Sequence, residues 1–243
     1  MRIAVISDVH SNLIALDAVL ADAGAVDAVW HLGDVVGYGP EPDAVVERLA
    51  AVGAVGVRGN HDAAALGGPE IDWFNPDARS AMEWTREAIS ERTRSWLAGL
   101  PERREVAGFT LVHGSGRDPT WEYVTSPAAA RASLAAMRTP HGMNGHTHIP
   151  VAFLQAGDRT GRLWPEGGTP DGTVVLDGGR LLLNPGSVGQ PRDGDPRASY
   201  LILDTEAGTV TWQRVPYDVA AVGTAMRAAG LPARLADRLR YGM

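Results

Sequence analysis

The sequence contains no cysteine and no lysine among its 243 residues. The lack of cysteine excludes disulfides, thiolate metal sites, iron–sulfur clusters and cysteine nucleophiles. The lack of lysine excludes a Schiff base, a lysine general base and the lysine of a P-loop. No run of about 18 apolar residues occurs, so we expect no membrane-spanning segment. The short apolar start, Met1–Ile6, lacks the length of a signal peptide, and we expect a cytoplasmic protein.

Positive charge is also scarce, because 22 basic residues stand against 29 acidic ones and give a net charge of −7. This balance argues against a long nucleic-acid track and against a basic membrane-binding surface. A hydrophobic content of 44% excludes a disordered or fibrous chain. We find no repeat, linker or shift in composition, and therefore expect one domain over 1–243. It would carry a helical insert around 63–100 and a helical tail around 218–240.

Short apolar strands alternate with helices in the first sixty residues. Strands are expected at 3–7, 28–32 and 55–58, with one helix capped by Ser11 and another over 42–52. This alternation indicates an α/β fold with parallel strands. A helix is then expected from Pro76 toward Ser90, followed by a second short helix that ends near Gly99, a strand at 109–113 and a helix from Pro127 to about Met137.

After residue 141 the pattern changes to strands that follow one another without helices, which favours antiparallel pairing. These strands are expected at 149–156, 161–165, 173–176, 180–184, 199–204 and 209–215. We expect each half of the chain to supply one sheet, with the two sheets face to face and helices outside them.

Polar residues stand where the expected strands end. They are Asp8, His10, Asp34, Asn60, His61, His113, His146 and His148. Ligand sites of α/β sheets gather outside the carboxyl ends of the strands. The remaining two of the seven histidines, His31 and His141, are assigned to packing and to a turn. One such segment carries little weight, but five together are hard to explain by packing, because unpaired buried polar groups are costly.

Imidazole, carboxylate and amide ligands without thiolates suit Mn, Fe, Zn, Co or Ni. The candidates are too many for one ion and fit two, and two ions about 3.5–4 Å apart are typical of hydrolysis at phosphorus. A pair that close needs a bridging carboxylate. Asp34 is favoured, because the second strand is expected to lie between the two sites. His61 adjoins Asn60, and we do not expect neighbours to face the same ion.

The order of these segments resembles the calcineurin-like metallophosphoesterase superfamily. The matching blocks are Asp8-x-His10, Gly33-Asp34, Gly59-Asn60-His61-Asp62, His113-Gly114 and Gly145-His146-Thr147-His148. Asn184-Pro185-Gly186-Ser187 and the following Arg192-Asp193 resemble the bacterial and archaeal small-phosphodiesterase branch. Apart from the resemblance, the favoured interpretation of Asn184-Pro185-Gly186-Ser187 is a tight turn that ends a strand.

The resemblance implies a four-layer α/β/β/α sandwich of two facing mixed sheets and a site for two divalent transition metal ions, with Mn favoured. It implies that one ion is held by Asp8, His10 and His148, and the other by Asn60, His113 and His146. Asp34 would bridge the ions and a hydroxide between them would be the nucleophile. His61 would be catalytic, protonating the leaving oxygen.

One departure from the family bears on the substrate. In protein phosphatases of the superfamily the second block continues into Asp-Arg-Gly, whereas here it continues as Val35-Val36-Gly37-Tyr38-Gly39. This difference puts protein phosphatase activity in doubt and favours a small phosphate ester or nucleotide. The resemblance thus implies a phosphodiesterase acting on cyclic nucleotides or similar esters, and alternatively a dinucleoside polyphosphate hydrolase. A non-catalytic protein-binding scaffold is the alternative of another class, and the complete ligand set argues against it.

Aromatic residues of the insert have two interpretations. Trp73 and Phe74 precede the helix cap at Asn75, where they could overhang the site and stack on a base. Packing is the favoured interpretation. Trp121 and Tyr123, soon after His113, have the same two interpretations.

Overall fold

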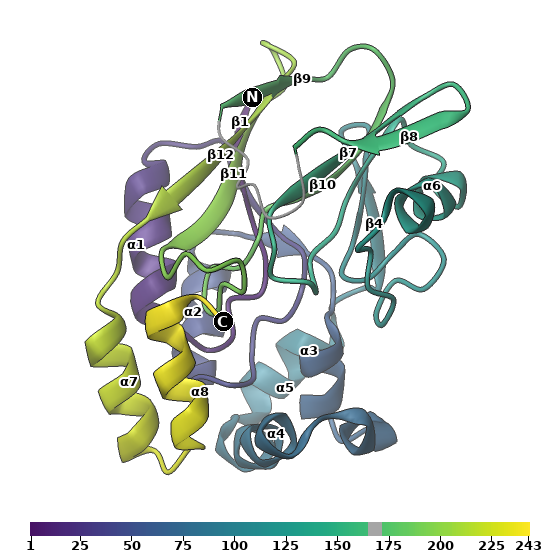
Figure 1. Ribbon diagram of the computed structural model, residues 1–243. Coiled ribbons are helices and arrows are strands. Elements are labelled where there is room, and N and C mark those ends of the chain that lie inside the picture. The colour runs from purple at the N-terminus through teal and green to yellow at the C-terminus, as the bar shows by residue number, and fades with distance from the viewer. Residues whose placement is uncertain (165–171) are drawn as a thin grey trace.

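The computed structural model describes residues 1–164 and 172–243, which form two six-stranded sheets with helices around them (Figure 1). The first sheet contains β1 (Arg2–Ile6), β2 (Ala28–His31), β3 (Val55–Gly56), β9 (Thr173–Val175), β11 (Ala198–Asp204) and β12 (Thr209–Val215). The second contains β4 (Arg103–Val106), β5 (Phe109–Val112), β6 (His141–Met143), β7 (Val151–Ala156), β8 (Arg159–Arg162) and β10 (Arg180–Asn184). The strand orders are β3-β2-β1-β11-β12-β9 and β4-β5-β6-β10-β7-β8. Both sheets mix parallel and antiparallel pairs, which confirms the expected fold class.

The alternation of side chains along β1 shows why the sheets face each other. Ile3 and Val5 are fully buried in a cluster that also contains Leu111 of β5, from the other sheet. Ala4 and Ile6, which alternate with them, belong to a second cluster with Leu16, on the helix side of the first sheet. A strand that is apolar on both faces is stable only between two covering layers, so β1 lies between helices and the second sheet.

Helices cover the outer faces of both sheets. The helices are α1 (Leu13–Ala23), α2 (Pro42–Ala51), α3 (Asn60–Ala65), α4 (Pro76–Ala88), α5 (Glu91–Ala98), α6 (Pro127–Ala135), α7 (Val219–Ala228) and α8 (Ala233–Arg238), with 3-10 turns η1 (Pro69–Trp73) and η2 (Leu239–Tyr241). Figure 1 shows α1 and α6 on opposite sides of the pair of sheets. Leu134 of α6 packs with Phe153 and Leu182 on the outer face of the second sheet. The order of layers is therefore helix, sheet, sheet, helix.

The insert helices α3, α4 and α5 lie together at one end of the sheets, with α7 and α8 near them (Figure 1). Tyr38, Ala81 of α4 and Leu235 of α8 share one buried cluster, so the insert and the C-terminal helices meet around the loop after β2. Within the described part of the chain, no helix has the length and apolarity needed to cross a membrane.

Two sequence-based expectations about the sheets are wrong. The halves of the chain do not each supply a sheet, because β11 pairs with β1 in antiparallel register, with Leu203 opposite Ile3. Strands β4 and β6 were not expected either. The strand β4 has a charged sequence that does not indicate a strand, but it pairs with β5 at the edge of the sheet. His141, which was assigned to a turn, begins β6, and this strand lies between β5 and β10.

Three smaller differences concern element boundaries. The first helix is capped by Asn12, whose side chain accepts a hydrogen bond from the Ala15 amide, rather than by Ser11. The hairpin strand expected at 161–165 lies at Arg159–Arg162, and residue 165 is outside the described residues. The third strand ends at Gly56 rather than at residue 58.

Candidate metal centre

The structure brings all seven candidate ligands together at the carboxyl ends of strands from both sheets. Asp8 and Asp34 follow β1 and β2 of the first sheet, whereas His113 follows β5 of the second. His146 and His148 lie between β6 and β7, and the remaining candidates, His10 and Asn60, lie in the loop after β1 and at the start of α3. All of these side chains are buried. The expected convergence at the strand ends is present in the structure.

Two groups of ligand atoms share one carboxylate. In each group the ligand atoms lie within 4.8 Å of one another, and the groups are Asp8, His10, Asp34 and His148, and Asp34, His113 and His146. The shared oxygen, Asp34 Oδ2, lies 3.7 Å from His10 Nε2 and 3.3 Å from His113 Nε2. The Asn60 Oδ1 atom lies 3.0 Å from His113 Nε2, next to the second group. These two groups match the division that the family resemblance implies, and their binding of two ions stays a prediction.

Backbone carbonyls determine the tautomer of each histidine. His10 Nδ1 lies 3.2 Å from the Val36 oxygen, and His148 Nδ1 lies 2.6 Å from the Gln190 oxygen. A ring nitrogen that donates to a carbonyl carries the proton, so the Nε2 atoms of both rings carry lone pairs. These two Nε2 atoms face each other at 3.1 Å. Neutral rings in this tautomer place no hydrogen between them, and a cation is the partner that satisfies both lone pairs.

The second group has the same construction. His113 Nδ1 lies 2.8 Å from the Leu32 oxygen, and His146 Nε2 lies 3.1 Å from the Trp121 oxygen. The opposite nitrogens, His113 Nε2 and His146 Nδ1, then face each other at 3.1 Å. Metal-binding histidines characteristically donate their other ring N–H in this way, which orients the ring and increases its basicity.

Asp8 supplies a second sign that a cation belongs here. Its Oδ1 atom is buried and has no hydrogen-bond partner among the described residues, and it points at the His148 Nε2 atom, 3.2 Å away. Burial raises the pKa of Asp8, but the nearby His148 and His113 rings outweigh burial and lower this pKa overall. A buried carboxylate that stays charged needs a positive partner. The donor set therefore fits divalent metal ions.

Asp34 and His113 have opposite pKa shifts. Burial lowers the pKa of His113, but the Asp34 carboxylate outweighs burial and raises it to about 9. The pKa of Asp34 is held well below its usual range, because His113 and His61 outweigh the effect of burial. A metal ion competes with the proton for the lone pair of His113, so ion binding at this position releases a proton.

The backbone around the centre is strained. Five of the candidate ligands have a positive φ: Asp8 at 53°, His10 at 49°, Asp34 at 51°, His146 at 68° and His148 at 59°. Residues with a side chain rarely adopt this left-handed conformation, which costs about 1–3 kcal/mol each and persists where the surrounding structure enforces it. Such strain is concentrated at functional sites.

Asp62 holds the loop that presents Asp34. Its Oδ1 atom accepts hydrogen bonds from the amides of Val35, at 2.8 Å, and Val36, at 3.1 Å, and its Oδ2 atom accepts one from Gly59 at 3.0 Å. Burial and the neighbouring Asp34 carboxylate raise the pKa of Asp62 to about 7. Sequence reasoning quoted Asp62 in a block but gave it no role. Its place in the Gly59-Asn60-His61-Asp62 block was the only signal in the sequence, and its role follows from burial, because a buried carboxylate must accept hydrogen bonds.

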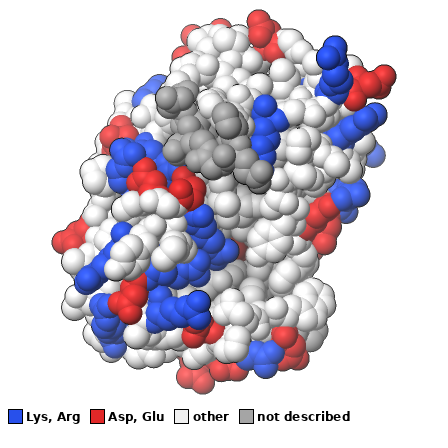
Figure 2. Space-filling model, in the orientation of Figure 1, with Lys and Arg blue, Asp and Glu red and all other residues white. Residues whose placement is uncertain are grey.

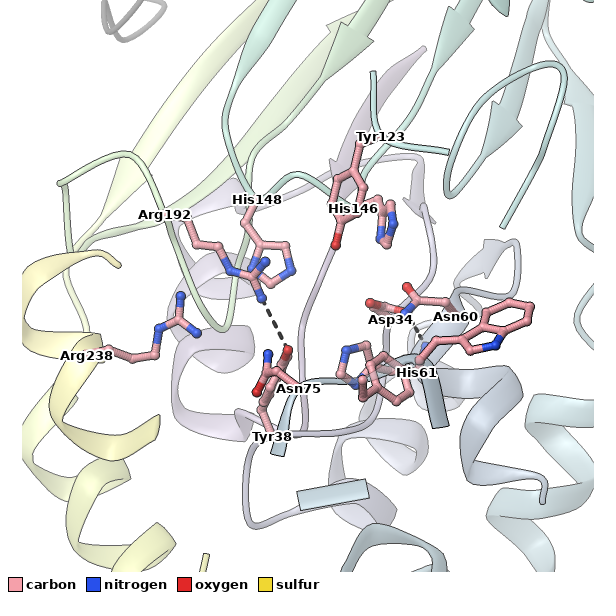
Figure 3. Close-up of a pocket in the computed structure, with 12 residues that line it drawn as sticks. Asp34, Tyr38, Asn60, His61, Asn75, Tyr123, His146, His148, Arg192 and Arg238 are labelled. Carbon is pink, nitrogen blue, oxygen red and sulfur yellow. Dashed lines mark hydrogen bonds between the residues drawn. The ribbon is translucent and has the colours of Figure 1, made fainter. Parts of the chain in front are cut away.

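His61 belongs to neither ligand group among the described residues, and its ring lines the adjacent cavity. Its backbone amide donates to Asp34 Oδ1 at 2.9 Å (Figure 3), while its ring packs against Tyr38 and Phe74 at 4.5 and 4.6 Å between ring centroids. Burial lowers the pKa of His61 to about 4, although Asp34 acts in the opposite direction. Asn60 and His61 open α3 rather than end a strand, so the helical turn separates their side chains.

A cavity of about 260 Å³ opens over the centre. Figure 3 shows Asp34, Asn60 and His61 grouped on one side, with Arg192 and Arg238 on the opposite side. Its remaining lining residues are Tyr38, Trp73, Phe74, Asn75, Tyr123, His146 and His148. Sequence reasoning attached no role to Tyr38 or Arg238. The sequence carries no signal for Arg238, because only the folding of α8 onto the body places it here.

Comparisons with known proteins show the family and the fold to which this chain is similar. The model of the calcineurin-like phosphoesterase superfamily domain matches residues 1–208. An uncharacterized protein of Methanocaldococcus jannaschii, MJ0912, is 34% identical over 252 residues, covering 99% of this chain and 98% of that protein.

Two solved structures are similar over their whole length. A metallophosphoesterase from Sphaerobacter thermophilus has a TM-score of 0.89 and 42% identity, with 100% of both chains covered. The hypothetical protein PH1004 from Pyrococcus horikoshii has a TM-score of 0.80 at 20% identity, covering 100% of this chain and 98% of the other. The latter similarity concerns the fold alone.

Proposed function

The chain belongs to the calcineurin-like phosphoesterase superfamily, and from this premise we propose that it hydrolyses small phosphodiesters with the help of two divalent metal ions. One observation carries the proposal. Four histidines, each fixed at one ring nitrogen by a backbone carbonyl, direct their other ring nitrogens at one another beside the Asp8 and Asp34 carboxylates. Such a buried arrangement has no purpose in packing and suits a metal pair at a reaction centre.

The ligand groups suggest which residues hold each ion. Asp8, His10 and His148 would hold one ion, Asn60, His113 and His146 the other, and Asp34 both. When bound, two such ions supply Lewis-acid stabilisation of phosphoryl charge and activate water. We propose manganese as the ion, because mixed carboxylate, amide and imidazole donors accommodate it.

His61 would act on the leaving oxygen of the ester. Its low pKa, about 4, leaves the ring neutral at pH 7 with one N–H available for donation. An anionic phosphoryl group beside the ring raises this pKa again, because a nearby negative charge favours the protonated form. The packing of Tyr38 and Phe74 against the ring limits its motion and keeps it at the cavity.

Aromatic residues around the cavity support a nucleotide as substrate. Trp73 is 70% exposed and Tyr123 is 53% exposed, whereas Phe74 packs on His61. The Trp73 ring is held edge-on against Trp121 at 4.9 Å, which leaves a face free for a base. Stacking of a base on an aromatic ring contributes about 1–3 kcal/mol. A dinucleoside polyphosphate is the second candidate substrate, because two arginines, which can bind additional phosphate groups, also line the cavity.

The test compares nitrophenyl esters with Mn²⁺-loaded protein. We expect faster hydrolysis of bis(p-nitrophenyl) phosphate, a diester, than of p-nitrophenyl phosphate, a monoester. We also expect Trp73→Ala to raise KM for a nucleotide substrate about tenfold, with little change for the nitrophenyl diester, which serves as the internal control. If the monoester were the best substrate of a broad panel, the diesterase proposal would be wrong.

A further inference from the structure

Two arginines, Arg192 and Arg238, stand on one side of the cavity. Arg192 donates to Gln190 Oε1 at 2.9 Å and to the Tyr38 hydroxyl at 3.4 Å, and Arg238 Nε donates to the backbone oxygen of Met243. Over residues 1–164 and 172–243, neither guanidinium has an acidic side chain within ion-pair distance. The adjacent carboxylate, Asp193, is already paired with Arg214.

The two guanidinium groups act on each other. Burial lowers the pKa of Arg238, and the charge of Arg192 lowers this pKa further. Arg192 Nε is buried and has no hydrogen-bond partner in the described part of the chain. Both guanidinium groups line the same cavity, and an anion bound there would accept hydrogen bonds from them and offset their like charges. A planar guanidinium group can donate two parallel hydrogen bonds to two oxygens of one phosphate.

The arginine pair lies one aromatic ring away from the candidate ligands. The Arg192 guanidinium carbon is 5.8 Å from the centroid of the Tyr38 ring. That ring lies 4.7 Å from the His10 ring and 4.5 Å from the His61 ring, between centroids. Figure 3 shows both guanidinium groups turned toward the cavity, with Arg238 coming from α8. Figure 2 shows basic side chains gathered beside a hollow near the C-terminal end of the chain.

We propose that Arg192 and Arg238 bind a second phosphate of the substrate, next to the phosphate that is hydrolysed. The substrate class is then a phosphate ester with a phosphoanhydride-linked neighbour, such as a nucleoside or dinucleoside polyphosphate, rather than a cyclic mononucleotide. Hydrolysis adds water across one P–O bond: the water oxygen bonds to phosphorus, the bridging oxygen departs and takes a proton. This inference rests on the proposed function, because it assumes that the metal centre holds the phosphate that reacts.

Calorimetric titration of Mn²⁺-loaded protein tests the site without relying on turnover. The probes are imidodiphosphate, which carries two phosphorus atoms and resists hydrolysis, and inorganic phosphate, which carries one. We expect Arg238→Gln and Arg192→Gln to weaken imidodiphosphate binding at least about tenfold and phosphate binding less than about twofold. Arg238→Lys keeps the positive charge but cannot donate two parallel hydrogen bonds to one phosphate, so its loss of imidodiphosphate affinity should be intermediate.

Arg234→Gln is the matched control, because this α8 arginine is 86% exposed and lies 4.0 Å from Asp77. It should change neither affinity. Metal content and thermal midpoint are measured for every variant, so that a loss of the centre or of the fold is recognised. Equal losses for the two probes in both glutamine variants would overturn the second phosphate site, as would no loss for either.

The proposed function is tested separately by wild-type hydrolysis of bis(p-nitrophenyl) phosphate, which has one phosphorus atom. If the wild-type protein fails to hydrolyse it but the arginine variants lose imidodiphosphate selectively, the phosphate site stands and the diesterase proposal falls. If the wild-type protein hydrolyses the diester but the arginine variants show no selective loss of imidodiphosphate, the diesterase proposal stands and the second phosphate site falls.

Discussion

Each imidazole of the candidate centre uses one ring nitrogen to donate to a backbone carbonyl, and this contact determines which nitrogen faces the proposed metal ions. For His148 the carbonyl is that of Gln190, and for His113 it is that of Leu32. The chemistry of the centre therefore depends on main-chain atoms that no residue type specifies. The sequence predicts the ligands from their types and their positions after strands, but these supporting contacts follow only from the folded loops.

His61 is not one of the candidate ligands, and its proposed role is to donate a proton to the leaving oxygen. A single substitution tests this role. His61→Gln should keep both metal ions and the fold while kcat falls by about 10²–10⁴-fold for an ester with a poor leaving group. The loss should be smaller for bis(p-nitrophenyl) phosphate, because nitrophenolate departs without a proton. Steady-state kinetics and metal analysis provide the measurements.

His141→Asn is the control for this substitution, because His141 lies in β6 and its Nδ1 accepts a hydrogen bond from the Leu181 amide, away from the centre. It should leave kcat for both esters near the wild-type value. Equal losses for good and poor leaving groups in His61→Gln would argue against proton donation.

At the scale of elements, loops of unusual backbone carry the site and regular strands support it. The strands β1, β2 and β5 were expected because their apolar sequences are buried on both faces. The short β6 and the charged β4 were missed, since only pairing with β5 makes them strands. Local propensity is weak for such segments and tertiary contacts decide their structure. The helix α8 lies within the helical tail expected at 218–240, but only its packing brings Arg238 to the cavity.

Gly59, at the start of α3, shows how closely these loops fit together. A Cβ atom at this position would lie 2.1 Å from Asp34 Oδ1 and 2.3 Å from the Asp34 amide nitrogen. Gly59→Ala should therefore lower the free energy of unfolding by about 1–3 kcal/mol, since the loop after β2 must shift. Because that loop carries Asp34, metal affinity should fall as well. Denaturant unfolding and metal titration measure the two effects.

Gly161→Ala gives a matched control in the strand β8, where an added Cβ would meet no other atom of the described residues within 4 Å. It should change the free energy of unfolding by less than about 0.5 kcal/mol and leave metal affinity unaltered. A Gly59→Ala protein with wild-type stability and metal affinity would contradict the close fit seen at Asp34.

At the scale of the whole molecule, the centre joins the two sheets. Asp8 and Asp34 come from the first sheet, His113 and His148 from the second, and Asp8 Oδ2 accepts the His146 amide across the gap at 3.2 Å. Fold class and this convergence follow from the sequence, because alternating strands and helices place their carboxyl ends at a common edge. The exchange of strands between the halves was not predictable, since no local signal marks β11 as the partner of β1. That residues 1–243 form one domain stays a prediction.

A centre built from both sheets should couple metal binding to global stability. Ions that bind only the folded state add about 2.7 kcal/mol at a hundredfold excess over Kd. For a chain of this size each kcal/mol raises the thermal midpoint by about 2–4 °C, so saturating Mn²⁺ should raise it by about 5–10 °C. A chelator should reverse the increase. Asp34→Asn should show a much smaller increase, because the amide lacks the charge that both ligand groups share. Calorimetric scans with and without Mn²⁺ measure both proteins, and an equal increase in the variant would contradict a shared carboxylate at Asp34.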